Sequence, residues 1–294
     1  MEITRVNAEE IAAAVRSGIA EDHPAPFEGL FGDRTAAYES YVVGLSEFGV
    51  PPVGLACSDD GDVKAIVAWV DPAPEAGTLE VAAVRIIGLF AAAPDEDKAY
   101  YIVKVLDALT ARLRQQQREY LIIEINPDDD FVIHILEGSN FVLVNAADVL
   151  VAGGRGLSET GPALESTEHG GAFEDFVAEP AAPAVDPYLG DFAVRARRRE
   201  FVRAAEQGRA YYVVESETRI GALTVGDEPG LPNGTVSVSL VHPWHDARVF
   251  AAALTIDAER FVVRVPLAAT VLRAELADRG FRPCDVRLTY RKLL

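Results

Sequence analysis

One stretch of the chain constrains the fold more than any other. TLEVAAVRIIGLFAA, residues 78–92, is a long apolar strand, and YLIIEIN, residues 120–126, is a continuously apolar strand of the kind that is buried on both faces. The segment between them predicts a helix that starts near Asp95, because its apolar residues recur at the spacing of one helix face: Ile102, Val105, Leu106, Leu109 and Leu113. A strand, a helix and a second buried strand predict a right-handed parallel crossover.

The elements around this crossover complete one half of the chain. MEITRV is a predicted strand, helices are predicted at residues 9–19 and 34–48, and the DDGD turn predicts a hairpin within residues 53–70. After the crossover, DFVIHILEGSN predicts a short helix and FVLVNAADVLVA a closing hairpin.

The same order of elements returns in the second half. RAYYVVESETRIGALTV predicts a hairpin around Glu217 and Thr218, TVSVSLVHP a strand, and HDARVFAAALTI a helix that starts near Asp246. RFVVRVP, TVLRAELADRGF and CDVRLTYRKL then predict a buried strand, a helix and a final strand. We therefore expect a structural duplication of the mixed α/β class, with an α+β mixed sheet in each half.

A segment rich in Gly, Ser, Thr and Glu separates the two halves. GGRGLSETGPALESTEHGG, Gly153–Gly171, predicts a linker. We expect an N-terminal domain at residues 1–152, a linker at 153–171 and a C-terminal domain at 172–294.

Composition narrows the class of protein. The 294 residues are 49% hydrophobic and can bury the cores of two domains. The sequence has no apolar run of membrane-spanning length and no secretion-type start, so we expect a cytoplasmic protein without membrane contact. Cys57 and Cys284 lie far apart in apolar segments, and the five histidines are scattered, so we expect ordinary thiols and no metal site.

The chain is acidic, and the acidity is uneven. The net charge is −19, of which residues 1–150 hold −16 with 10 Lys and Arg against 26 Asp and Glu. Such a field repels phosphate backbones, so we expect no nucleic-acid partner. A solvated acidic surface or a cationic partner fits the charge.

The order of elements resembles a tandem pair of GNAT folds, the fold of the acyl-CoA N-acyltransferase superfamily. The best local matches end the two halves: INPDDDFVIHILEGSNF contains Asn126 and Phe141, and LRAELADRGFRP contains Gly280 and Phe281. The resemblance implies acetyl-CoA or another acyl-CoA as cosubstrate, and an acyl group passed to the amine of a small molecule.

In GNATs, the loop before the crossover helix carries an Arg or Gln and spaced glycines, so that free N–H groups and the helix dipole hold the pyrophosphate of CoA. The first half has PDEDKAYYI here, with Asp97 in place of the basic or amide residue and no glycine. We interpret Asp95, Glu96 and Asp97 as acids that cap their own helix. The first half would then be a structural GNAT domain.

The matching stretch of the second half is VHPWHDARVF, residues 241–250, where His242, His245 and Arg248 tolerate an anion. The resemblance therefore implies a cofactor-binding set in this half: Val241, Trp244, Ala247 and Arg248. In the alternative interpretation Asp246 is only the N-cap, Trp244 fills a gap and the histidines are solvated.

The tyrosine that protonates the leaving thiolate in many GNATs matches Leu136 and Leu276 here, and neither side chain can transfer a proton. Another group must carry any proton. The candidates are Glu80 as a base in the first half and three side chains assigned to the second: His242, His245 and Tyr290.

FAVRARRREFVRAAEQGR, residues 192–209, is the dense basic stretch of the chain, and Arg195, Arg199 and Arg203 share one helical face. This face is either solvated or in contact with phosphates or with the acidic first half. The overlapping stretch DPYLGDFAVRARRREFVRAA, residues 186–205, resembles the acceptor side of GNATs that acylate nucleotide-linked amino sugars.

The leading functional hypothesis is an acyl-CoA-dependent N-acyltransferase whose second half is active. The alternative is a GNAT fold that transfers no acyl group, either a ligand-binding or scaffold protein or an enzyme of another reaction class. A third possibility, a tandem GNAT ligase that uses charged tRNA, conflicts with the net charge of −19.

Overall fold

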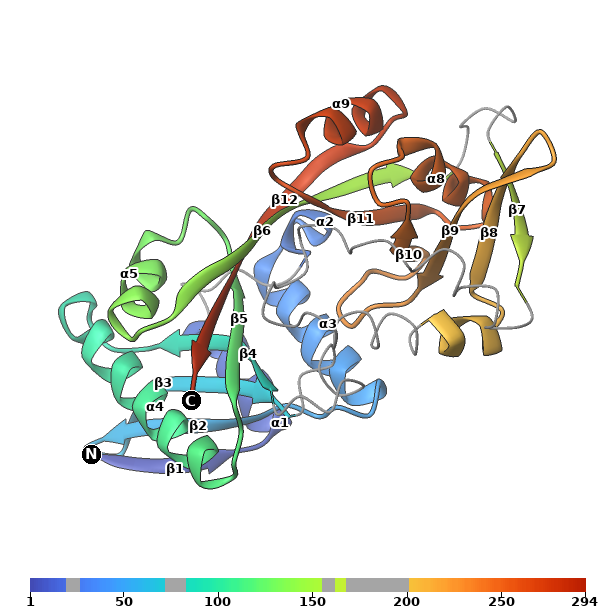
Figure 1. The fold of residues 1–294 in the computed structure, drawn as a ribbon. Helices are drawn as coiled ribbons and strands as arrows, with labels where there is room; N and C mark the ends of the chain where they lie inside the picture. Colours follow the sequence, from blue (N-terminus) through green and yellow to red (C-terminus); the bar gives the residue numbers. More distant parts are fainter. Residues whose placement is uncertain (20–26, 72–82, 155–161, 168–200) are drawn as a thin grey trace. The chain divides into compact units, whose positions relative to one another are not determined.

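The computed structural model describes residues 1–19, 27–71, 83–154, 162–167 and 201–294. These residues form two compact units (Figure 1): one comprises Met1–Val144 with Arg287–Leu294, and the other comprises Asn145–Val286. Each unit contains a mixed sheet with helices packed against it. The predicted mixed α/β class is confirmed.

The described sheet of the first unit has the order β1-β2-β3-β4-β5-β12. Its antiparallel part consists of β1 (Glu2–Val6), β2 (Val53–Asp59), β3 (Asp62–Val70) and β4 (Ala83–Ala91). β5 (Tyr120–Ile125) runs parallel to β4, and Leu288–Leu293 of β12 (Arg282–Leu293) pair with the other edge of β5. The DDGD turn closes the β2–β3 hairpin as predicted, with Asp60 and Gly61 at positive φ.

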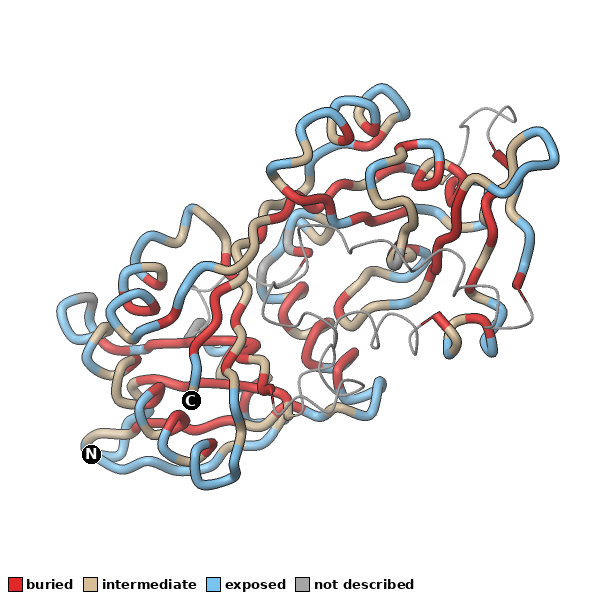
Figure 2. Tube along the Cα trace, viewed as in Figure 1, coloured by how far each residue is buried: buried red, intermediate tan, exposed pale blue. Residues whose placement is uncertain are grey.

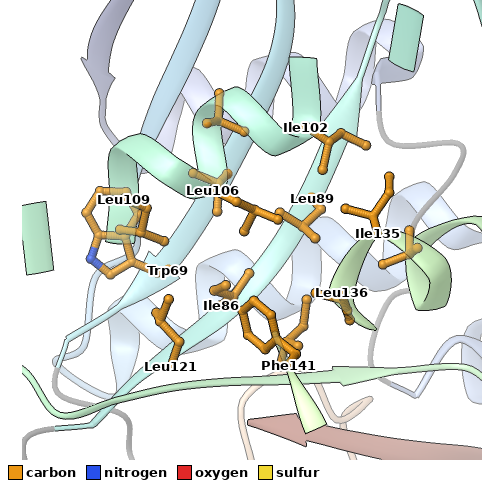
Figure 3. Close-up of a cluster of buried hydrophobic side chains, with 14 of the residues drawn as sticks. Trp69, Ile86, Leu89, Ile102, Leu106, Leu109, Leu121, Ile135, Leu136 and Phe141 are labelled. Carbon is orange, nitrogen blue, oxygen red and sulfur yellow. The ribbon is translucent and has the colours of Figure 1, made fainter. Parts of the chain in front are cut away.

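The predicted crossover helix is α4 (Asp95–Gln115), which packs on β2, β3 and β4. Its apolar stripe meets the sheet and α5 (Asp130–Gly138) in one buried cluster. Figure 3 shows Ile102, Leu106 and Leu109 of α4 directed at side chains of the strands and of α5: Trp69, Ile86, Leu89, Leu121, Ile135 and Leu136. Burying each such side chain contributes roughly 1.5–3 kcal/mol.

The opposite face of this sheet is covered by helices from the start of the chain. They are α1 (Ala8–Ala14), the π-helical turn Val15–Ile19, and α3 (Arg34–Glu47), with the short α2 (Glu28–Phe31) before it. Tyr38 and Leu45 of α3 are fully buried against Ile87 and Phe90 of β4. The first unit is therefore a sheet with helices on both faces.

The second unit repeats this plan with the described strand order β6-β11-β10-β9-β8-β7. The strands are β6 (Val142–Gly153), β7 (Ala163–Ser166), β8 (Ala210–Glu215), β9 (Thr218–Gly226), β10 (Thr235–His242) and β11 (Arg260–Pro266). β10 and β11 form the parallel pair, as β4 and β5 do in the first unit.

The crossover helix of the second unit is shorter than α4. The crossover consists of α8 (Ala247–Ala252) and a 3₁₀ turn at Ala253–Thr255, and α9 (Thr270–Asp278) follows β11. They cover one sheet face, where Phe250, Phe261 and Phe281 are buried. Figure 2 shows the strands of both units mostly buried and the outer sides of the helices exposed.

The closing strands differ from the sequence prediction. FVLVNAADVLVA is one strand, β6, and not a hairpin, because Ala147–Gly153 continue straight into seven pairs with β11 of the second unit. The end of β12 pairs with the first unit's β5 instead of the second unit's sheet. The units therefore differ from the ranges 1–152 and 172–294, and part of the predicted linker is strand β7.

The strand β12 places a lysine in the hydrophobic core of the first unit. Lys292 is 8% exposed, its ammonium donates to the Thr110 hydroxyl of α4 at 3.5 Å, and it lies 5.5 Å from the centre of the Phe141 ring. Burial lowers the pKa of Lys292 from its ordinary value of 10.5, although the charge of Asp107 opposes the shift. The charged form is therefore disfavoured in the folded state.

We expect Lys292→Met to raise the midpoint of thermal unfolding at neutral pH, because methionine fills the site without a buried charge. The folded-state pKa lies below the unfolded value of 10.5, so the unfolded state holds more protons between the two values. The penalty is complete below the folded pKa and disappears as the pH rises through that pKa toward 10.5. Thermal unfolding of both proteins between pH 7 and pH 10.5 checks this. A difference that stays constant across this range would contradict it.

Candidate functional site

The two parallel strands of each unit pair over four residues, and beyond the last pair they are no longer hydrogen-bonded to each other. In the first unit Ala83–Ile86 pair with Tyr120–Ile123, and β4 runs on to Ala91. In the second unit Thr235–Val238 pair with Arg260–Val263, and β10 runs on to His242. Backbone groups beyond the last pair of such strands can bind an extended ligand that carries amides.

An irregularity in register lies at the same place in both units. Against β3, Ala68 faces Gly88 and Trp69 faces Ile86, so Ile87 is an extra residue of β4. Against β9, the register of β10 shifts between Ser239 and His242. Bulges of this kind bend a strand and redirect its backbone groups.

The predicted second-half residues lie together in the β10–α8 segment. Val241 and His242 end β10, and the His242–Pro243 peptide bond is cis. The carbonyl of His242 lies so close to Gly221 of β9 that a Cβ there would be 2.5 Å away. The ring of Trp244 packs against the core and meets the exposed His245 ring edge-on, with centroids 5.7 Å apart. His242 is therefore the histidine that lies on the diverging strand.

The start of α8 is closed by its own side chains. The Asp246 carboxylate is the N-cap and accepts the backbone N–H of Arg248 at 2.9 Å. The Arg248 guanidinium binds Asp246 through Nε at 3.1 Å and Nη2 at 2.7 Å, and Glu215 through Nη1 at 2.7 Å. Burial raises the pKa of Asp246, but the hydrogen bonds from Arg248 outweigh it and the net pKa is lowered. Ala247 is fully buried.

This arrangement changes how Arg248 can act. Its hydrogen bond to Asp246 and the nearby Glu215 raise the pKa of Arg248 above its ordinary value, so the guanidinium is a charged group already engaged by two carboxylates. A phosphate bound here would compete with both carboxylates for the Arg248 guanidinium. No local sequence pattern indicates Glu215, because it lies 33 residues before Arg248, at the end of β8.

The start of α4 has no such closure. Its N-cap residue is Pro94, which makes no side-chain hydrogen bond, and the Pro94 carbonyl accepts the N–H groups of Asp97 and Lys98. Glu96 and Asp97 are exposed, and the side chain of Asp95 lies outside what the structure describes. The N-cap position is therefore a proline, and the capping role of the acids stays a prediction.

Tyr290 lies in the first unit, and its assignment to the second half is corrected by the pairing of β12. It faces Ile123 of β5, which in turn faces Ile86 of β4, so the three residues cross the sheet at the last parallel pair. Its buried hydroxyl lies 3.3 Å from a Glu137 carboxylate oxygen of α5. Burial and the Glu137 charge raise the pKa of Tyr290.

No protein-family model and no curated protein matches the sequence, but solved structures match its fold. A GCN5-related N-acetyltransferase from Sphaerobacter thermophilus aligns over 99% of this chain and 95% of its own, with 14% identity and a TM-score of 0.57. A tandem GNAT protein from the clavulanic acid biosynthesis pathway aligns over 99% and 98%, with 14% identity and a TM-score of 0.55. A conserved protein of unknown function from Staphylococcus epidermidis aligns over 81% and 94%, with 9% identity and a TM-score of 0.51.

The chain has a tandem GNAT fold. The structural alignments show the shared fold alone, because the identities are 9–14%, and the chemistry has to be argued from side chains.

The other predicted side chains lie in the cores of the units, on the surface, or outside the described residues. Leu136 and Leu276, at the positions of the expected tyrosine, are both fully buried in the core of their unit. Glu80 lies outside the described residues, as do Arg195 and Arg199 of the basic stretch. The described part of that stretch is helical at residues 201–206, where Phe201 is buried and Arg203 is exposed as the predicted two-faced helix requires.

Two further features are absent from the residues that the structure describes. No group of three or more His, Cys, Asp or Glu side chains there could hold a metal ion. No helix among them combines the length and hydropathy needed to cross a membrane.

Proposed function

We propose that the protein is a GNAT-type acyltransferase that moves an acyl group from acyl-CoA to the amine of a small molecule, with the second unit active. The observation that carries the proposal is the position of His242. It stands four residues beyond the last β10–β11 pair, on the strand edge that no longer pairs with its parallel neighbour. In the first unit, the residue four positions beyond the last β4–β5 pair is Phe90, which is buried and cannot carry a proton.

The reaction needs few groups from the protein. The nitrogen lone pair of a neutral amine attacks the thioester carbonyl, a C–N bond forms, and the tetrahedral intermediate collapses as the C–S bond breaks and the thiolate leaves. The amine loses one proton and the thiolate takes one up. An imidazole is suited to accept the first proton near neutral pH, and backbone groups of β10 and β11 beyond the last pair would align the donor.

A second candidate is the GNAT fold without acyl transfer, and the charges at both helix starts favour it. Glu96 and Asp97 are exposed at the start of α4. Asp246 and Glu215 surround the single guanidinium of Arg248 at the start of α8. A pyrophosphate in either place would lie near carboxylates that repel it. In this case the strand edge would bind a different ligand.

Calorimetric titration with acetyl-CoA and with CoA separates the two candidates. We expect binding, and we expect Arg248→Glu to weaken it by about tenfold or more, because a charge-assisted contact is lost and a third carboxylate is added beside Asp246 and Glu215. Asp97→Ala, which removes a carboxylate from the other unit, is the matched control and should leave the affinity unchanged. Loss of affinity in Asp97→Ala alone would move the site to the first unit, and no binding by the wild type would favour the second candidate.

A further inference from the structure

In the first unit a buried hydroxyl binds the backbone just beyond the last parallel pair. That pair is Ile86 with Ile123. The hydroxyl of Tyr38 on α3 donates a hydrogen bond to the carbonyl of the next residue, Ile87. Tyr38 is fully buried, and its ring meets Phe90 edge-on with centroids 5.1 Å apart. The bond therefore forms on the sheet face covered by α3, away from the plane of the sheet.

The second unit does the same with a different side chain. Its last parallel pair is Val238 with Val263. The hydroxyl of Thr224 on β9 donates to the carbonyl of the next residue, Ser239, at 3.0 Å, and lies 2.9 Å from the Ser239 hydroxyl. Thr224 is 2% exposed. A tyrosine from a helix and a threonine from a strand thus reach the same backbone position in the two units.

The physical effect of this bond follows from the geometry of a ladder. A parallel pair continues only if the carbonyl of each successive pairing residue points along the sheet at its neighbour. A carbonyl held by a hydroxyl on the face of the sheet is turned away from that direction, and its need for a donor is already met. In the first unit Gly88 makes room for this arrangement, since a Cβ there would lie 2.6 Å from the Tyr38 hydroxyl oxygen.

We propose that Tyr38 and Thr224 are positioning residues that hold the parallel strands apart, each by fixing the carbonyl at which its strand leaves its neighbour. In the second unit, Thr224 would thereby keep open the strand edge to which the acyl donor binds. The statement about the donor rests on the proposed function. The statement about the strands does not.

Amide hydrogen exchange followed by NMR tests the statement about the strands without a ligand. Tyr38→Phe keeps the ring and removes the hydroxyl, so an amide within residues 124–126 should exchange about tenfold more slowly as the ladder extends by one bond. Thr224→Val should do the same within residues 264–265, and Thr224→Ser, which keeps a hydroxyl, should exchange like the wild type. Unchanged or faster exchange in both Tyr38→Phe and Thr224→Val would overturn the proposal. If Tyr38→Phe does not fold, the Thr224 pair decides alone.

Titration of the same proteins with acetyl-CoA tests the statement about the donor. Thr224→Val should bind acetyl-CoA about tenfold more weakly, because the strand edge that aligns the donor is no longer held open. Thr224→Ser and Tyr38→Phe should bind it like the wild type. Equal affinity in Thr224→Val and the wild type would overturn the role of Thr224 in donor binding. A wild type that binds no acetyl-CoA would end the proposed function, and the exchange rates would still decide whether the hydroxyls hold the strands apart.

Discussion

Gly88→Ala is expected to lower the free energy of unfolding by about 1–3 kcal/mol, the range of an overpacked core. A Cβ at this position would lie 2.1 Å from Cζ of the Phe90 ring and 2.6 Å from the Tyr38 hydroxyl oxygen. Both side chains are buried against α3 and the sheet, so neither can move aside without disturbing its neighbours. Urea unfolding at equilibrium measures the change.

Gly138→Ala is the matched control for Gly88→Ala. Gly138 ends α5, and a Cβ added there would meet nothing within 4 Å. Alanine in a helix should be neutral or stabilising by up to about 1 kcal/mol relative to glycine. Equal stabilities of Gly88→Ala and the wild type would mean that the backbone of β4 moves freely at the bulge, and that the geometry of the strand edge is not fixed.

His242→Ala is expected to reduce turnover by about 10²–10⁴-fold while the protein stays folded, because a positioned proton acceptor contributes a factor of that size. The side chain lies at the end of β10 and is half-buried, so its removal leaves the sheet pairing in place. Turnover with acetyl-CoA and a panel of small amines measures the effect.

His245→Ala is the control for His242→Ala, because it removes an exposed imidazole three residues away. It should keep most of the activity. The reverse result, with His245 required and His242 dispensable, would place the chemistry at the exposed end of the β10–α8 segment. Equal activity of both variants and the wild type would remove both histidines from the reaction.

Local patterns in the sequence predicted most elements, because each depends on neighbours a few residues apart. The apolar stripe of α4, the turn at Asp60 and Gly61 and the helix start beside Asp246 are all of this kind. The turn at Ser216 and Glu217, both at positive φ, likewise lies next to the predicted hairpin centre.

What the sequence could not predict depends on partners far along the chain. Nothing in the residues of β6 says that Ala147–Gly153 pair with β11. Tyr290 lies within the second half of the sequence, which predicts a place in the second domain, yet β12 carries it to β5. The bonds of Arg248 to Glu215 and of Tyr38 to Ile87 also join residues far apart in the sequence. The sequence therefore predicted the residues of the β10–α8 segment but not the partners that hold them.

The placement of β12 has a consequence for how the protein is made on the ribosome. The first unit contains residues 1–144, but its strand β5 has an unpaired edge until Leu288–Leu293 arrive. Domains usually fold in order as they emerge during synthesis. Here the first unit has to wait with an exposed apolar strand edge while the whole second unit is translated, and an exposed strand edge is prone to aggregation. The excess of acidic residues in 1–150 would keep such waiting chains apart by charge repulsion.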